Sequence, residues 1–135
     1  MKTVFVDANV FLRFFTTGNE EQHDRAAGLF RLAAARKVAL VTGPPVLFEI
    51  AWSLRSAYEQ PKAKVLDALA AIASLPGLEL TDSRTVEEAL VLARTSDQEF
   101  ADAYIMAASR QWSGGEIATF NQKHFERLGA VLHKF

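Results

Sequence analysis

Val4-Phe5-Val6-Asp7-Ala8-Asn9 places a carboxylate directly behind a short run of β-branched and aromatic residues. A run of this kind predicts a buried strand of a parallel sheet, over residues 2–6. Asp7 would then lie at the carboxyl end of that strand, the edge where open α/β sheets bind ligands. A charge at this edge is costly to remove from water unless something pairs with it, so Asp7 is a candidate site residue.

Hydrophobic periodicity predicts strands and helices that alternate along the rest of the chain. Further strands are expected at residues 38–41, 78–80, 116–119 and 130–133, and helices at residues 21–36, 46–58, 61–75, 83–94, 96–112 and 122–128. Residues 10–15 form a short helix or a loop. Strands separated by helices predict an α/β fold with a parallel sheet covered on both faces. With 135 residues and no linker or repeat, the chain is expected to form a single domain over residues 1–135.

Composition excludes some classes of protein and favours others. Half of the residues are hydrophobic, which is enough for a sizeable core, and the absence of cysteine excludes disulfides and thiolate metal sites. The chain shows no signal peptide and no apolar run of transmembrane length, so we expect a cytoplasmic protein without a membrane partner. A net charge of −1 does not fit nucleic-acid binding through bulk positive charge. A nucleic-acid substrate would need a local basic patch or a metal ion.

Two acids have both a structural and a functional interpretation. Asp7 suits the N-cap of a helix that follows it, and Asn9 could serve the same purpose. Glu49 is the only charge in a long apolar run, near the start of a helix that Pro44 and Pro45 introduce, where the helix dipole favours an anion. Its neighbours on all sides are large and apolar. We therefore expect Glu49 to face inward and to have a partner, rather than to be exposed.

Asp102 is a third acid in apolar surroundings, in the first turns of a helix rich in alanine. The small side chains favour close packing against the sheet, so Asp102 is expected to point towards the carboxyl edge. Ser96 and Glu99 have the spacing of a capping box, which would start this helix near residue 96. That role for Glu99 is favoured over metal contact, and Asp97 is expected to be a solvated acid at the helix start.

A fourth group of polar residues follows the strand predicted at residues 116–119. Asn121 has a carbonyl oxygen that would ligate a hard cation or hold a water on it. His124 is either a general base or, as is more common for a lone histidine in a surface turn, a residue without a direct role.

Three carboxylates that converge in one cleft would repel one another unless a cation neutralised them. Oxygen ligands are those that Mg²⁺ and Mn²⁺ prefer. Such an ion activates water and neutralises charge on a phosphodiester. If Asp7, Glu49 and Asp102 meet, the residues therefore predict metal-assisted phosphoryl hydrolysis.

The chain resembles PIN-domain ribonucleases, and specifically the VapC-type toxins of toxin–antitoxin pairs. Four segments carry the resemblance, in family order from one end of the chain to the other: Val6-Asp7-Ala8-Asn9-Val10-Phe11-Leu12, Pro45-Val46-Leu47-Phe48-Glu49-Ile50, Phe100-Ala101-Asp102-Ala103-Tyr104-Ile105 and Thr119-Phe120-Asn121-Gln122-Lys123-His124-Phe125. The first and third are short, but the set of four is specific. Asp7, Glu49 and Asp102 fall on the three principal metal-binding acids of the family.

The resemblance implies a three-layer α/β/α fold with a parallel sheet of about five strands. It implies Mg²⁺-dependent cleavage of RNA, with Mn²⁺ as a substitute, that leaves a 5′-phosphate and a 3′-hydroxyl. Asp7, Glu49, Asp102 and Asn121 would be the catalytic residues. A homodimer and a cognate antitoxin protein, whose tail occupies the active-site groove, are also implied.

One segment departs from the family pattern. The family often has a fourth acid at or just after the position of Asn121, whereas here Asn121 and His124 are followed by no acid before Glu126. The departure implies a weaker second metal site, so we expect one tightly held ion.

Residues near the predicted carboxyl edge outline an RNA surface. Arg13, Lys123 and Arg127 are candidates for contacts with phosphates. Phe14 and Phe15 either stack on bases or pack an interface, and packing is favoured.

Two other functions fit parts of the pattern. A phosphatase of the haloacid-dehalogenase type also begins with a strand and an aspartate, but it uses a second aspartate where this chain has Asn9. A catalytically degenerate PIN domain, acting as an RNA- or protein-binding module, would explain the missing fourth acid. The three retained acids argue against it, because a binding module has no need of clustered buried charge.

Overall fold

The chain is described by a computed structural model over all residues 1–135, which divides it into two compact units. Unit 1 comprises Met1–Ser83 and unit 2 comprises Arg84–Phe135. Each unit has its own strands and helices, and we describe the two separately. No helix in either unit combines the length and the apolar character that a membrane span requires.

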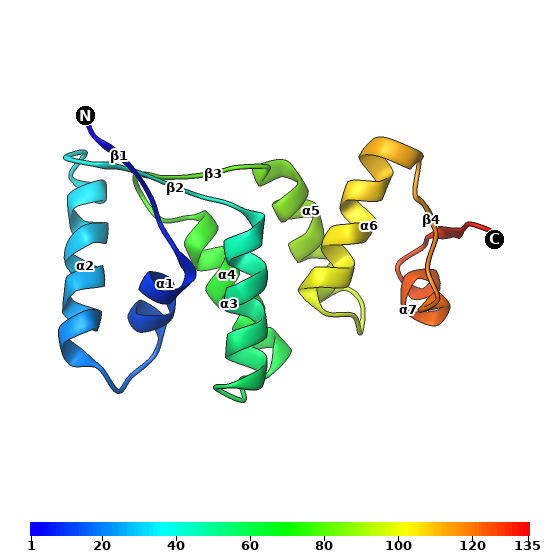
Figure 1. The fold of residues 1–135 in the computed structure, drawn as a ribbon, viewed down its shortest axis with the longest axis horizontal. Helices are drawn as coiled ribbons and strands as arrows, with labels where there is room; N and C mark the ends of the chain where they lie inside the picture. Colours follow the sequence, from blue (N-terminus) through cyan, green and yellow to red (C-terminus); the bar gives the residue numbers. More distant parts are fainter. The chain divides into compact units, whose positions relative to one another are not determined.

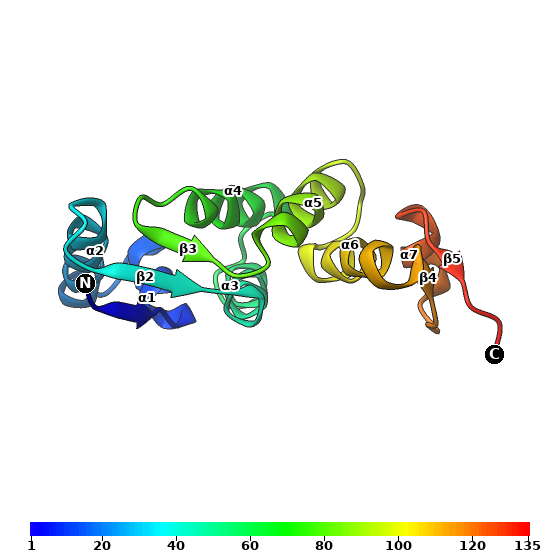
Figure 2. The ribbon, with the colours of Figure 1, turned by 90° about the horizontal axis from the view of Figure 1, so that it is seen from above.

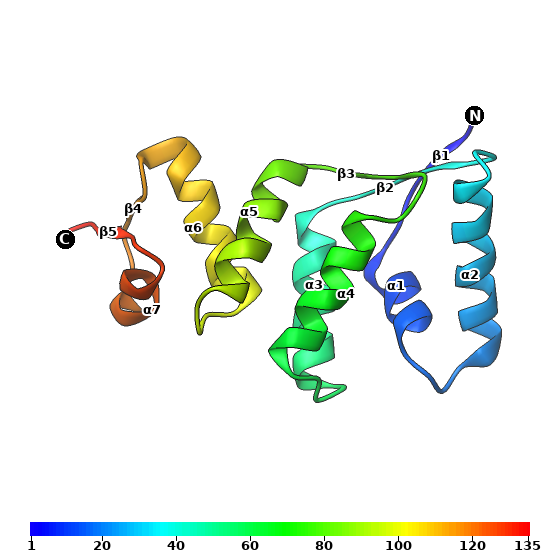
Figure 3. The ribbon, with the colours of Figure 1, turned by 180° about the vertical axis from the view of Figure 1, so that it is seen from behind.

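Unit 1 contains a parallel sheet of three strands, in the order β1 (Thr3–Phe5), β2 (Ala39–Thr42) and β3 (Leu78–Leu80). Its helices are α1 (Ala8–Phe15), α2 (Glu20–Ala34), α3 (Pro44–Ser56) and α4 (Lys62–Ala73). Figure 2 shows the three strands side by side and pointing the same way. In Figures 1 and 3 the four helices lie on the same side of the sheet, so this unit alone has two layers.

The core of unit 1 lies between the sheet and its helices. Large side chains that are almost fully buried come from α1, α3 and α4 and from β2, namely Phe11, Leu40, Leu47, Ile50, Leu66, Leu69 and Ile72. The ring of Phe11 stacks on Phe30 of α2 at 5.6 Å, and Phe14 meets Phe30 edge to face at 4.8 Å. Aromatic pairs of this geometry stabilise packing beyond the area that they bury. Phe14, which belongs to α1, therefore packs against α2.

Unit 2 contains two parallel strands, β4 (Glu116–Ile117) and β5 (Val131–Leu132), and the helices α6 (Phe100–Ser113) and α7 (Gln122–Arg127). The helix α5 (Ser83–Arg94) begins at the last residue of unit 1 and otherwise belongs to unit 2. Met106, Ile117, Phe125 and Leu128 form a buried cluster that joins α6 and α7 to the strands. α6 ends at Gly114, which adopts a left-handed conformation with φ of 62°.

The predicted alternation of strands and helices is confirmed, with helix and strand ends shifted by up to a few residues. The α/β class and the parallel pairing are confirmed as well, although the five strands form one sheet of three and one of two. The prediction that the first strand is buried is wrong, since no residue of β1 is buried. Because β1 pairs only with β2, it is an edge strand, and Phe5 is 61% exposed.

Candidate metal and catalytic site

Asp7 follows the end of β1, and hydrogen bonds hold that end against β2. The backbone N–H of Val6 donates to the Val41 carbonyl at 2.8 Å. The hydroxyl of Thr42, which is fully buried, donates to the Val6 carbonyl at 2.9 Å. A buried hydroxyl paired in this way holds the two strand ends in a fixed register. The carboxyl end of β1, where the sequence places Asp7, is therefore well ordered.

The side chain of Asp7 is not used as a helix cap. Asp7 occupies the N-cap position of α1, with φ of −86° and ψ of 164°, but its carboxylate makes no capping hydrogen bond. Asn9 lies inside the helix and so is not the cap either. The side chain of Asp7 is exposed at the start of α1. Its carboxylate is thus free to bind a cation or another external partner. A role as helix cap would have left it less available.

Glu49 lies on α3, which follows β2 through Gly43. Carboxyl ends of neighbouring parallel strands meet at one edge of a sheet, so α1 and α3 both begin at the edge that carries Asp7. α3 begins at Pro44, which places Glu49 in its second turn rather than its first.

The expectation that Glu49 faces inward is wrong. Glu49 is exposed, on the same face of α3 as Trp52, which is itself 69% exposed and not part of the core. These residues are spaced three apart, so they share one side of the helix, and the apolar residues of α3 cover the other side. The apolar surroundings of Glu49 in the sequence therefore did not indicate burial.

Asp102 and His124 come together in unit 2. Asp102 lies in the first turn of α6, where the prediction placed it, and its side chain is 30% exposed. The Nδ1 atom of His124, on α7, lies 3.5 Å from the Oδ2 atom of Asp102. His124 is therefore not an isolated surface histidine. It contacts the Asp102 carboxylate, which sequence spacing did not reveal.

The start of α6 differs from the prediction. The helix begins at Phe100, and Glu99 is its N-cap position without a side-chain capping bond. Ser96 accepts a hydrogen bond from the N–H of Gln98 at 3.2 Å, which closes a local turn instead of a capping box. Asp97 pairs with Arg127 at 2.7 Å and is not simply solvated. Arg127, a candidate for phosphate contact, is thus engaged by an acid.

Asn121 occupies the N-cap position of α7 and makes no side-chain capping bond. Its backbone N–H donates to the hydroxyl of Thr119 at 2.9 Å, and its side chain is exposed. The amide oxygen of Asn121 is therefore as free as the carboxylate of Asp7. It belongs to the same unit as Asp102 and His124.

The predicted ligands are divided between the two units. Asp7 and Glu49 belong to unit 1, and Asp102 and Asn121 belong to unit 2. Neither unit by itself brings three acidic or histidine side chains together. The donor types still fit a hard divalent cation, because all four offer oxygen and the side chains of Asp7 and Asn121 have no capping role.

Comparison with known proteins identifies the family. A search of curated proteins found no match. The PIN domain family matches residues 4–131, which includes both units and all four predicted site residues. PIN domains are commonly nucleases and typically use divalent metal ions. This match does not favour the alternative of a haloacid-dehalogenase phosphatase, and over almost its whole length the chain belongs to the PIN domain family.

Proposed function

We propose that the protein is a metal-dependent endoribonuclease that hydrolyses RNA phosphodiester bonds. The observation that carries the proposal is the family match over residues 4–131. The carboxylate of Asp7, which follows β1 and does not cap a helix, supports it. Asp7, Glu49 and Asp102 are the proposed ligands of one Mg²⁺, or of Mn²⁺ in its place, and Asn121 assists. This assignment requires units 1 and 2 to act as one domain, which we infer because the family spans both.

When bound, a divalent ion supplies charge neutralisation at the phosphodiester and activation of water. The residues of the chain provide its binding and orientation. Asp7 precedes α1 and Glu49 lies on α3, two helices that begin at one sheet edge, and the imidazole of His124 lies 3.5 Å from the carboxylate of Asp102. Of these groups, Asp102 is the one that we assign to accept the proton of the attacking water.

We further propose that the protein is the toxin of a VapBC-type pair, with a cognate antitoxin and a homodimeric state. Exposed aromatic side chains occur in both units, with Trp52 69%, Trp112 89% and Phe120 89% exposed. Large exposed apolar groups are typical of surfaces that partner proteins cover. They support a protein partner, and the choice of an antitoxin rests on the resemblance of the four segments.

The test of the proposed activity is cleavage of a mixed pool of tRNA and rRNA by the purified protein. Mg²⁺ or Mn²⁺ should produce discrete fragments that EDTA abolishes. Absence of fragments with either metal would contradict a nuclease acting on these RNAs. Co-purification of the protein with the product of an adjacent small open reading frame, and loss of cleavage in that complex, would test the toxin assignment.

A second candidate is a degenerate PIN domain that binds RNA or protein without cleaving. The departure at the fourth motif favours it, since Asn121 stands where the family often has a fourth acid. The two candidates differ in metal binding. Calorimetric titration with Mn²⁺ should show one saturable site for the nuclease and none for the binding module.

Asn121→Asp should tighten Mn²⁺ binding several-fold. The substitution adds a carboxylate to the unit that holds Asp102, and affinity for hard cations rises with the number of charged ligands. Calorimetric titration of the variant and the wild type measures the effect. Asn19→Asp is the matched control, because Asn19 is also a helix N-cap but its side chain already accepts a bond from Gln22 at 3.0 Å. Equal effects of both substitutions would place residue 121 outside the coordination sphere.

A further inference from the structure

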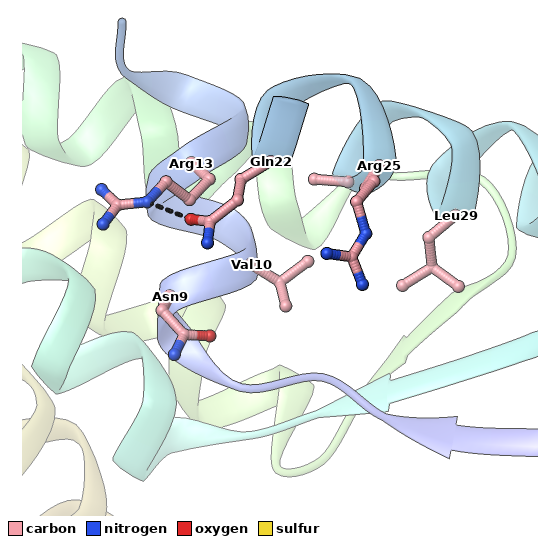
Figure 4. A pocket seen from close by; sticks show the side chains of 7 residues that line it. Asn9, Val10, Arg13, Gln22, Arg25 and Leu29 are labelled. Carbon is pink, nitrogen blue, oxygen red and sulfur yellow. Dashed lines mark hydrogen bonds between the residues drawn. The ribbon is translucent and has the colours of Figure 1, made fainter. Parts of the chain in front are cut away.

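A pocket lies between α1 and α2 in unit 1, beside the helix start that carries Asp7. Its volume is about 440 Å³, within the range of small-molecule and cofactor sites. Figure 4 shows its lining, which comprises Asn9, Val10, Arg13, Gln22, Arg25, Ala26 and Leu29. The lining residues recur at helical spacing on the facing sides of the two helices, so the pocket is a product of how α1 and α2 pack.

The lining combines two guanidinium groups with two amides and contains no acid. Arg13 Nε donates to the amide oxygen of Gln22 at 2.6 Å, and Arg13 Nη1 lies 3.4 Å from the hydroxyl of Tyr58. Arg13 is therefore held in place by neutral partners that leave its charge unpaired. Val10, Ala26 and Leu29 provide an apolar floor against which charges are less well hydrated.

Arg25 is the residue of this pocket whose guanidinium is free to bind a ligand. Its side chain is exposed and makes no hydrogen bond or ion pair within the chain. In Figure 4 its guanidinium extends from α2 towards Val10 of α1, into the space between the helices. A planar guanidinium presents several donors at once and matches the oxygens of a phosphate group. Arg13 and Arg25 thus place two positive charges at this pocket, whereas the net charge of the whole chain is −1.

We propose that this pocket binds a backbone phosphate of single-stranded RNA, with Arg25 as its main contact and Arg13, Asn9 and Gln22 as supporting donors. The proposal rests on the proposed ribonuclease function and adds a second point of contact for the strand. Asn9 stands two residues after Asp7, so the pocket adjoins the proposed metal ligand. Contacts to phosphates position a strand without selecting its sequence, which suits a site that orients RNA for cleavage elsewhere along the same strand.

Binding of a short fluorescent single-stranded RNA in EDTA, over a series of salt concentrations, tests the pocket without any cleavage. Arg25→Gln should weaken binding about tenfold, because a hydrogen bond to a charged group is lost. It should also reduce the slope of log affinity against log salt by about 0.7, the value for one phosphate contact on a single strand. Arg31→Gln is the control, because Arg31 is exposed on α2 but does not line the pocket.

Three results would overturn the proposal. One is an unchanged affinity and salt slope in Arg25→Gln, and another is an equal loss in Arg31→Gln, which would indicate a general charge effect. The third is absence of RNA binding by the wild-type protein. Metal-dependent cleavage of the RNA pool is measured separately, so the nuclease assignment can stand when the pocket fails. Both variants alter exposed side chains, and thermal unfolding should confirm that each is folded.

Discussion

Asp7→Asn is expected to lower metal-dependent RNA cleavage by more than about 100-fold. Loss of a group that only supports a metal ligand already reduces metal affinity or activity by about 10–100-fold, and Asp7 is a proposed ligand itself. The fragments produced from the RNA pool with Mg²⁺ measure the effect. Asp24→Asn is the matched control, since it removes the same charge from an exposed position on α2. Full activity of Asp7→Asn would remove Asp7 from the catalytic site.

The effect of Asp7 substitutions on the free energy of unfolding distinguishes a metal ligand from a helix cap. If the Asp7 side chain capped α1, Asp7→Ala would lower the free energy of unfolding by about 1 kcal/mol. Since the carboxylate makes no capping bond, we expect Asp7→Ala to change it by only a few tenths of a kcal/mol without metal. Asp7→Asn is expected to leave it unchanged or raise it, because in the proposed site Asp7 is one of three acids that repel one another when no metal is bound. Urea denaturation in EDTA provides the measurement. A loss of about 1 kcal/mol in Asp7→Ala that Asp7→Asn does not share would support the capping role, because asparagine caps a helix as well as aspartate does.

Gly77→Ala is expected to lower the free energy of unfolding by about 2–5 kcal/mol, combining left-handed strain with overpacking. Gly77 has φ of +79°, and a Cβ atom there would lie 2.3 Å from the backbone oxygen of Ala33. Its own carbonyl accepts a bond from Leu40 N–H at 2.9 Å, so the backbone cannot shift without disturbing β2. The loss is a large part of the total stability of a small domain.

Gly114→Ala separates the two causes of this loss. Gly114 also has a positive φ, of +62°, but nothing lies within 4 Å of a Cβ built on it. Only the left-handed strain remains, so a loss of about 1 kcal/mol is expected. Urea denaturation curves of the two variants and the wild type measure the difference. Similar losses in both would show that the close approach of Gly77 to Ala33 has little energetic effect.

Most helices and strands could be predicted because their signals are local. Pro44 and Pro45 introduce α3, as the sequence predicts. The start of α6 was misplaced because the capping-box spacing at Ser96 also fits a local turn, and the structure contains the turn. The exposure of Glu49 was misjudged for another reason. An apolar run shows that a helix has buried residues, but which side they occupy depends on its neighbours.

The candidate site was predictable only as a set of positions. The sequence places Asp7 after β1 and Asp102 in the first turn of α6, and the structure has both there. The contact of His124 with Asp102, at 3.5 Å, joins residues on two different helices and has no signature in the spacing. The pairing of Asp97 with Arg127 was missed for the same reason.

By itself, the sequence determined the alternation of strands and helices, the parallel α/β class and the placement of an aspartate after the end of a strand. These depend on periodicity, turn residues and chain order, which act over a few residues. Tertiary structure alone decided that the Asp7 carboxylate caps nothing, that His124 faces Asp102, and that Arg13 and Arg25 line one pocket. The physical reason is that all three depend on side-chain direction, and that the last two also depend on how one helix packs against another.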